Sequence, residues 1–193
     1  MLRLNFDPFP QLETERLVLR NMSLDDAPEI FFLRSDKDAM KYIDREPANT
    51  IKDAEELINK IIADIKTNET IMWAIALKED PKKLIGTICL WHFAKEHFRG
   101  ETGYMLHPQY WRKGIMKEAL LKVLDYGFHE LNLHSVEAHI SPDNFASATL
   151  LERTGFVREG YFKENFHFRG KFLDTAVYSK LKTDSANNKD SFG

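Results

Sequence analysis

The sequence between positions 101 and 121, ETGYMLHPQYWRKGIMKEALL, constrains the fold more than any other part of the chain. Its first residues predict a strand over Glu101–Leu106, which ends at the following His-Pro pair. A basic turn comes next, WRKGIM, and the good helix formers after it predict a helix over Lys117–Leu131. A strand, a tight basic turn and a helix in this order are typical of an α/β architecture.

The turn has the properties of an anion-binding site. Gly114 allows the backbone to bend and to lie close to a ligand. The amides after it begin a helix, whose unpaired N–H groups and dipole attract negative charge. Two neighbouring cationic side chains add to this attraction. A strand, a basic glycine turn and a helix start in this order predict a diphosphate-binding site.

The segment resembles the acyl-CoA-binding motif of the GCN-five-related N-acetyltransferases (GNAT), whose loop is written Q/R-x-x-G-x-G/A. Gly114 takes the first glycine position, Trp111 stands in place of Gln or Arg, and Met116 in place of the last Gly or Ala. The wider sequence, E-T-G-Y-M-L-H-P-Q-Y-W-R-K-G-I-M-K-E-A, is similar to the RimJ/RimL branch, which acetylates ribosomal-protein N-termini. The segments NFASATLLERTGF and TERLVLR resemble the same branch, so that the resemblance covers residues 14–182.

The resemblance implies one α/β domain over residues 14–182. Its fold would be a mixed, twisted sheet of about six to seven strands with helices on both faces. The family sheet splays between its fourth and fifth strands, which correspond here to Glu101–Leu106 and Ser135–Ile140.

In this family acetyl-CoA is the cosubstrate, and its pantetheine arm enters the gap between the splayed strands. Unpaired backbone groups at the gap can bind the pantetheine amides. The resemblance also implies a bulge near Gly103–Met105 that directs an N–H at the thioester carbonyl. Trp111 is expected to pack under the loop. The resemblance places the pantetheine contacts at Met105, Leu106, His107 and Asn144. It places the diphosphate contacts at Arg112, Lys113, Gly114, Ile115, Met116 and Lys117.

The resemblance implies direct transfer of the acetyl group to a primary amine in a ternary complex. An α-amine has a pKa of about 7.7–8.0, against about 10.4 for lysine, so it needs only modest help from a base. Glu101 is the candidate base, acting directly or through water. Leu151 stands where many family members have a tyrosine that protonates the CoA thiolate, and Ser147 is the expected substitute. A protein N-terminal α-amine is therefore the expected acceptor.

Other interpretations stay open. The acceptor could be a small amine, such as a polyamine, an amino acid or an aminoglycoside, and the chain could also bind acyl-CoA without catalysis. Glu101 has an ordinary role as a strand residue, and Asn144 and Ser147 have ordinary roles at a helix start. We expect the acceptor to contact Met40–Ala48 and Asn165–Gly170, whose sequences do not identify it.

Composition narrows the classes of function. The 193 residues, 43% of them hydrophobic, suffice for one domain with a sizeable core. A net charge of −3 argues against a general nucleic-acid binder. No apolar run approaches the roughly 20 residues that cross a bilayer, and the N-terminus lacks the pattern of a secretory signal. The single cysteine, Cys89, cannot form an internal disulfide. We therefore expect a cytoplasmic protein.

The histidines do not predict a metal site. His129 and His134 are five residues apart, so they do not share one helix face at the required spacing. His92 and His97 flank a loop and are predicted to lack a carboxylate partner. Members of the family often form pairs, so a homodimer is compatible with the resemblance.

Periodicity and turn residues predict the remaining elements. Gly155 is expected to end the last predicted helix, Phe145–Thr154, in a left-handed conformation. The tail, 183–193, is expected to be disordered. The predicted elements are strand Arg16–Asn21, helices Ser23–Ser35, Lys52–Lys66 and Phe145–Thr154, and the hairpins Ile71–Leu77 with Leu84–Trp91 and Phe156–Phe168 with Lys171–Leu181.

Overall fold

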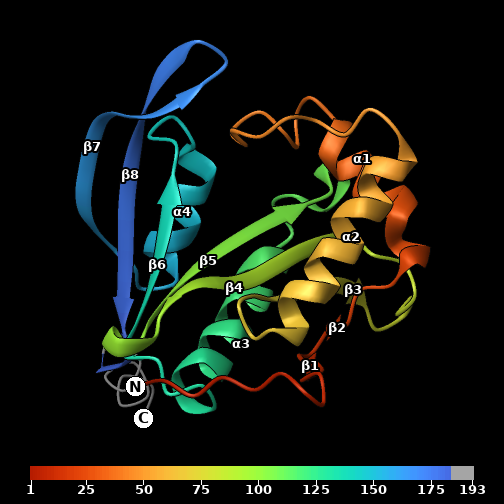
Figure 1. Cartoon of the computed structure of the whole chain (residues 1–193), viewed down its shortest axis with the longest axis horizontal. Coiled ribbons are helices and arrows are strands. Elements are labelled where there is room, and N and C mark those ends of the chain that lie inside the picture. The colour runs from red at the N-terminus through yellow and green to blue at the C-terminus, as the bar shows by residue number, and fades with distance from the viewer. Residues whose placement is uncertain (184–193) are drawn as a thin grey trace.

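An eight-stranded sheet forms the centre of the computed structural model, which describes residues 1–183 (Figure 1). The strand order is β1-β2-β3-β4-β5-β6-β8-β7, and only the β5–β6 pair is parallel. The strands are β1 (Leu12–Glu13), β2 (Leu17–Arg20), β3 (Ile71–Leu77), β4 (Gly86–Ala94), β5 (Arg99–Leu106), β6 (Ser135–Ile140), β7 (Val157–Phe168) and β8 (Lys171–Leu181).

Helices cover both faces of the sheet. They are α1 (Ala27–Ser35), α2 (Ile51–Lys66), α3 (Ile115–His129) and α4 (Phe145–Arg153). Neighbouring residues of a strand point to opposite faces. On β3, Trp73 packs edge-on against Tyr126 of α3, with ring centroids 5.5 Å apart, while Met72 faces a pocket that it shares with Ile61 of α2. The helices α2 and α3 therefore lie on opposite sides, as the resemblance implies.

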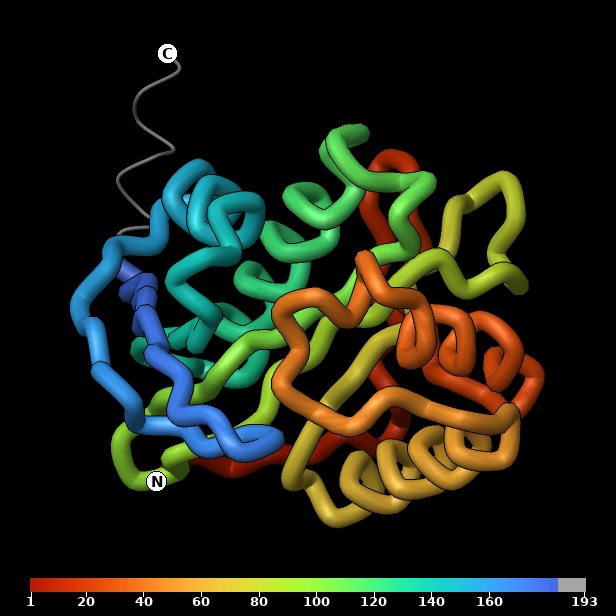
Figure 2. The backbone as a smooth tube through the Cα atoms, turned by 90° about the horizontal axis from the view of Figure 1, so that it is seen from above, coloured from red at the N-terminus to blue at the C-terminus, as the bar shows by residue number. Residues whose placement is uncertain are grey.

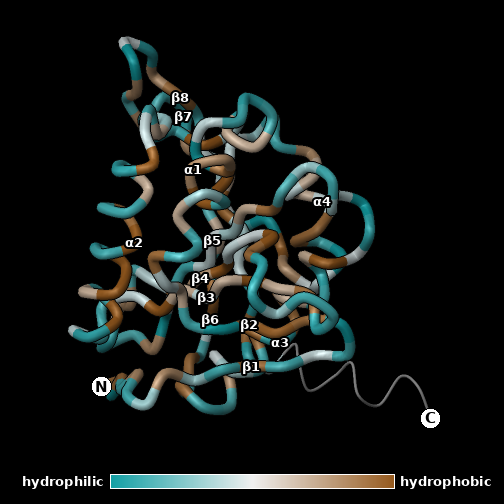
Figure 3. The backbone as a smooth tube through the Cα atoms, turned by 90° about the vertical axis from the view of Figure 1, so that its right-hand side faces the viewer, coloured by the Kyte–Doolittle hydropathy of each residue, from teal (hydrophilic) through white to brown (hydrophobic). Residues whose placement is uncertain are grey.

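The apolar pattern of α2 explains why this helix packs against the core of the protein. Thr50 caps its N-terminus by accepting a hydrogen bond from the Asp53 N–H. The buried residues Ala54, Ile58, Ile61 and Ile65 recur every three or four positions, so they form one stripe. Hydrophobic and hydrophilic segments alternate along this helix in Figure 3.

Residues before the region of resemblance also enter the core. Leu2 and Phe6 are buried in the same cluster as Trp73 and the inner face of α3. The indole N–H of Trp73 donates to the carbonyl of Pro10 at 2.7 Å. The N-terminal segment therefore packs against β3 and against the end of β4, where Phe6 lies beside Phe93.

The sheet splays where the resemblance places the gap. Only three residue pairs join β5 to β6, from Arg99–Ser135 to Glu101–Glu137. Beyond Glu101 the two strands diverge and no pairing continues, as Figure 1 shows. The fourth and fifth strands of the family correspond to β5 and β6 because the two-residue strand β1 adds one to the count. This short strand was not predicted.

Most element boundaries match the prediction to within three residues. The predicted helix at 117–131 runs instead from Ile115 to His129, because Gly114 already turns the chain into the helix. The segment predicted as one helix at 23–35 begins with a short 3-10 turn, Leu24–Asp26. Gly155 has a φ of 88°, which confirms its left-handed conformation after α4. The tail was predicted over residues 183–193, and residues 184–193 lie outside the described part of the chain.

The predicted bulge at Gly103–Met105 is wrong. These residues pair without interruption with Thr87, Ile88 and Cys89 of β4. The irregularity lies instead on β4, where Trp91 pairs with Glu101 but Ala94 pairs with Arg99. Two residues of β4, His92 and Phe93, thus oppose the single Gly100, and the φ of His92 is 45°. An extra residue of this kind changes the direction of the side chain at the bulge.

Candidate active site

A cavity of about 960 Å³ lies beside the splayed strands. β4 and β5 form its floor, with α1 and α2 on one side and the end of β6 and the start of α4 on the other. The loop after α1 reaches across to the turn between β7 and β8, where Arg169 pairs with Glu46 (Figure 2). This contact joins the two segments that were predicted to contact the acceptor, Met40–Ala48 and Asn165–Gly170.

The basic turn has the backbone geometry expected of an anion-binding site. Gly114 is left-handed, with a φ of 75°, and stands immediately before α3. Arg112, Lys113 and Gly114 are exposed, while Ile115 and Met116 bury their side chains and so direct the helix start. The first amides of α3 therefore follow directly after an exposed basic turn.

Arg16 is a third cation at this turn, and the sequence analysis missed it. Its guanidinium donates to the carbonyl of Lys113 at 3.1 Å and forms an ion pair with Glu118 on the first turn of α3. Burial raises the pKa of Glu118, but hydrogen bonds from Thr14 and Arg16 outweigh it and hold that pKa below the ordinary value. The motif TERL therefore supports the turn from a distant part of the chain.

The backbone of β5 presents alternate amides to the gap. The N–H of His107 donates to the carbonyl of Ile85, and its carbonyl accepts from Tyr110. Because the direction alternates along a strand, Met105 also turns its amide toward β4, whereas Tyr104 and Leu106 turn theirs toward the gap. On this same side of β5, the Leu106 carbonyl accepts a hydrogen bond from the Trp111 indole at 2.7 Å. The Leu106 N–H faces the gap.

Trp111 does not pack beneath the loop as predicted. Its side chain is 43% exposed, and its indole N–H is held by the end of β5. His107 is fastened separately, because its ring stacks on Phe32 of α1 with centroids 4.2 Å apart. These contacts order the connection between β5 and the basic turn.

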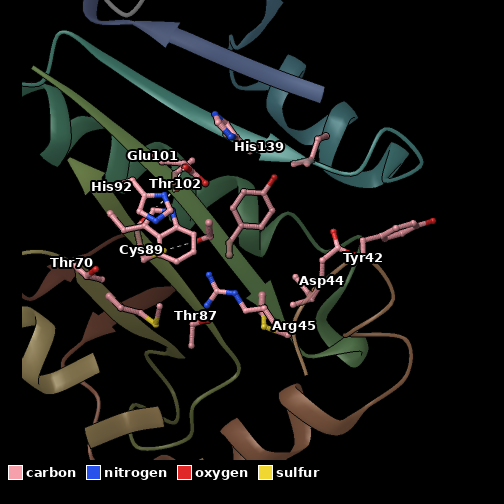
Figure 4. A pocket seen from close by; sticks show the side chains of 18 of the residues that line it. Tyr42, Asp44, Arg45, Thr70, Thr87, Cys89, His92, Glu101, Thr102 and His139 are labelled. Atoms are coloured by element: carbon pink, nitrogen blue, oxygen red, sulfur yellow. Dashed lines mark hydrogen bonds and ion pairs between the residues drawn. The ribbon is translucent and has the colours of Figure 1, made fainter. Parts of the chain in front are cut away.

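Glu101 lies at the point where β5 and β6 separate, and it lines the cavity. Its carboxylate is 2.9 Å from Nδ1 of His92, a contact that Figure 4 shows with both residues labelled. The prediction that His92 lacks a carboxylate partner is therefore wrong. The bulge on β4 explains the error, because it turns His92 to the same side as Glu101 and no sequence spacing reveals this.

Ser147 and Asn144 stand at the start of α4, where they line the same cavity. Asn144 caps the helix by accepting a hydrogen bond from the Ser147 N–H at 3.1 Å. Leu151, one turn further on, is fully buried in the core. The Ser147 side chain is therefore the hydroxyl group that α4 presents near the gap.

Tyr104 brings a second hydroxyl to this place. Among the described residues, no hydrogen bond satisfies its buried oxygen. Burial raises the pKa of Tyr104 to about 12, and the neighbouring Ser147 hydroxyl partly opposes this rise. The Tyr104 hydroxyl therefore lies beside that of Ser147, beneath the surface of the cavity wall.

Cys89 also lines the cavity, but it is not a nucleophile. Burial raises the pKa of its thiol to about 12, and its sulfur contacts the Gly103 carbonyl at 3.4 Å. The thiolate is the reactive form of cysteine. The arrangement therefore agrees with direct transfer and gives no support to an acyl-cysteine.

Within residues 1–183, no three His, Cys, Asp or Glu side chains are grouped to hold a metal ion. No helix there has the length and apolar character needed to span a bilayer.

Comparison with known proteins identifies the family. The pattern described as "Acetyltransferase (GNAT) domain" matches residues 16–157, so the chain belongs to the GNAT acetyltransferases. It is 38% identical to the uncharacterized N-acetyltransferase YoaA of Bacillus subtilis, over 90% of this chain and 98% of that one. The protein is thus an N-acetyltransferase of a family that uses acetyl-CoA.

Two solved structures have similar folds. One is spermidine N-acetyltransferase from Vibrio cholerae in complex with CoA and spermine, with 28% identity and a TM-score of 0.78 over 90% of this chain and all of that one. The other is ribosomal-protein-S5-alanine acetyltransferase from Vibrio fischeri, with 26% identity and a TM-score of 0.78 over 91% and 98% of the two chains. Similar folds therefore serve different acceptors.

Proposed function

We propose that this enzyme acetylates an amine acceptor of low charge, and that a protein N-terminal α-amine of the RimJ/RimL type is its substrate. The charge of the cavity carries this proposal. Acidic and basic side chains line it in nearly equal number, whereas a polyamine with several positive charges calls for a strong excess of acids. The acidic residues are Asp44, Asp64, Glu69, Glu101 and Asp174, and the basic ones are Arg34, Arg45, Lys60 and Lys95.

The basic turn would hold the diphosphate of acetyl-CoA. Exposed Arg112 and Lys113 supply charge, and the amides from Gly114 to Lys117 supply N–H donors. The pantetheine would enter the gap, where the N–H of Leu106 faces it. We also expected the backbone of Met105 and His107 to bind pantetheine. The Met105 amide is turned toward β4, and the His107 N–H already donates to the carbonyl of Ile85. Asn144 lies at the far side of the same gap.

In this arrangement Glu101 would assist loss of a proton from the amine. The amine then attacks the thioester carbon, and the C–S bond breaks as the amide forms. The Ser147 hydroxyl would donate a hydrogen bond to the departing thiolate. An α-amine needs only limited help from a base, because its pKa of about 7.7–8.0 leaves a large fraction of the amine neutral at physiological pH.

Spermidine is the second candidate acceptor. It is favoured by relatives, since the chain is 30% identical to the spermidine N(1)-acetyltransferase of Vibrio cholerae over 91% of its length. An identity of 30% does not by itself transfer the acceptor of that enzyme to this chain.

An acceptor panel tests the proposal. Thiol release from acetyl-CoA would be measured with ribosomal-protein N-terminal peptides, with the same peptides blocked at the α-amine but carrying a lysine, and with spermidine and an aminoglycoside. Release with the free α-amine alone supports the proposal. A preference for spermidine refutes the peptide acceptor, and CoA binding without release from any amine would indicate a non-catalytic protein.

A further inference from the structure

We infer that His92 is the proton acceptor of this site, and that Glu101 holds its ring in place. This inference rests on the proposed role of Glu101 in removing a proton, and it assigns the atom that receives the proton. His92 Nδ1 and Glu101 Oε2 are 2.9 Å apart. A carboxylate can only accept hydrogen bonds, so Nδ1 of the neutral ring carries the hydrogen. The lone pair of Nε2 is then free for the amine.

The bulge on β4 creates this pair. In a regular strand His92 would point away from the side chains of Trp91 and Glu101, because neighbouring residues alternate between faces. The left-handed backbone of His92 instead places its ring parallel to that of Trp91, with centroids 4.4 Å apart and planes 9° apart. A non-glycine residue in this conformation is uncommon and is often part of a functional site.

The ring of His92 is held from two directions. Glu101 fixes one edge, and Trp91 supports one face. The guanidinium of Arg45 in turn lies over the Trp91 ring, 4.7 Å from its centroid, and extends across the pocket in Figure 4. Such support reduces the freedom of the imidazole, so that Nε2 points in a defined direction.

Exposure shows which member of the pair an acceptor meets. The side chain of His92 is 67% exposed and lines the cavity, whereas that of Glu101 is only 15% exposed. An amine entering the cavity therefore reaches the imidazole before it reaches the carboxylate. Imidazole is also the better-matched base near neutral pH, because the reference pKa of such a ring is about 6.5, against about 4.3 for a glutamic acid side chain.

The proton balance is simple. The neutral amine forms a bond from nitrogen to the thioester carbon, and one N–H proton passes to Nε2 of His92. The C–S bond then breaks, and sulfur leaves with its electron pair. The thiolate takes up one proton while the imidazolium releases one to water, so that amine and thioester give amide and thiol.

Four variants and a matched control test the assignment. The variants are His92→Gln, His92→Ala, Glu101→Gln and the double variant His92→Gln/Glu101→Gln, and the control is His129→Gln. His129 forms a similar pair with Asp125 at 3.0 Å, but on α3 and outside the cavity. We expect each single active-site change to lower kcat roughly 10- to 100-fold, the double variant to fall no further, and the control to keep its rate. Added imidazole should restore part of the rate of His92→Ala.

The outcomes separate the two proposals. If Glu101→Gln is impaired while His92→Gln is not, Glu101 acts alone and the inference about His92 is overturned. The same conclusion follows if free imidazole has no effect on His92→Ala while that variant keeps its CoA affinity. If neither single variant is impaired, both proposals about the base fail. The identity of the acceptor is tested independently by the panel.

Discussion

Replacing Gly114 by alanine is the sharpest test of the proposed diphosphate site. The φ of 75° places this residue in the left-handed region, where a side chain costs about 1–2 kcal/mol. The added Cβ would meet only Arg16, with the guanidinium nitrogen 3.5 Å away, which is an ordinary contact. Folding should therefore survive, with a free energy of unfolding reduced by about that amount.

Gly170 provides a matched control. It lies in the turn between β7 and β8 with a φ of 76°, and no atom lies within 4 Å of an added Cβ. Gly170→Ala should cost the same backbone strain as Gly114→Ala, which urea unfolding of both variants would check. Only Gly114→Ala places a methyl group where the diphosphate must approach the backbone.

We expect Gly114→Ala to raise the Kd for CoA about tenfold, which corresponds to about 1.4 kcal/mol, while Gly170→Ala leaves it unchanged. Isothermal titration calorimetry measures both. If the two variants bind CoA with equal affinity, the amides after Gly114 do not hold the diphosphate.

Three further predictions concern other parts of the site and its support. Glu118→Gln should lower the free energy of unfolding at pH 7 by about 1 kcal/mol, because half-exposed Arg16 loses a charged partner. Since the folded-state pKa of Glu118 is lowered, its contribution is complete above the ordinary value of 4.5 and is lost as pH falls below it, so urea midpoints of variant and wild type should converge in acid. Gly155→Ala should destabilise by about 1–3 kcal/mol in thermal unfolding, because its Cβ would lie 2.4 Å from Lys180 Nζ and its φ is positive. Ser147→Ala should lower kcat about 10- to 100-fold without weakening CoA binding, and an unchanged kcat would remove this hydroxyl from the mechanism.

Local patterns alone were enough to predict most elements of the fold. The strands Ile71–Leu77 and Ser135–Ile140 match their predicted bounds, because apolar, β-branched segments between turns have few other stable conformations. The helix start at Gly114 was also predictable, since glycine readily adopts the positive φ that a tight turn requires. The order of these elements indicated the α/β class, and the resemblance to the family implied the position of the splay.

Contacts between distant segments decided the rest. Arg16 reaches the basic turn from 97 positions away, and only the folded chain brings the two together. The His92–Glu101 pair depends on one extra residue in β4, which shifts the direction of a side chain without leaving a mark in the periodicity. The charge of the cavity likewise comes from seven separate elements and loops. Sequence therefore determined which cosubstrate site to expect, whereas tertiary structure decided which side chains line the cavity, because register and packing depend on the whole sheet.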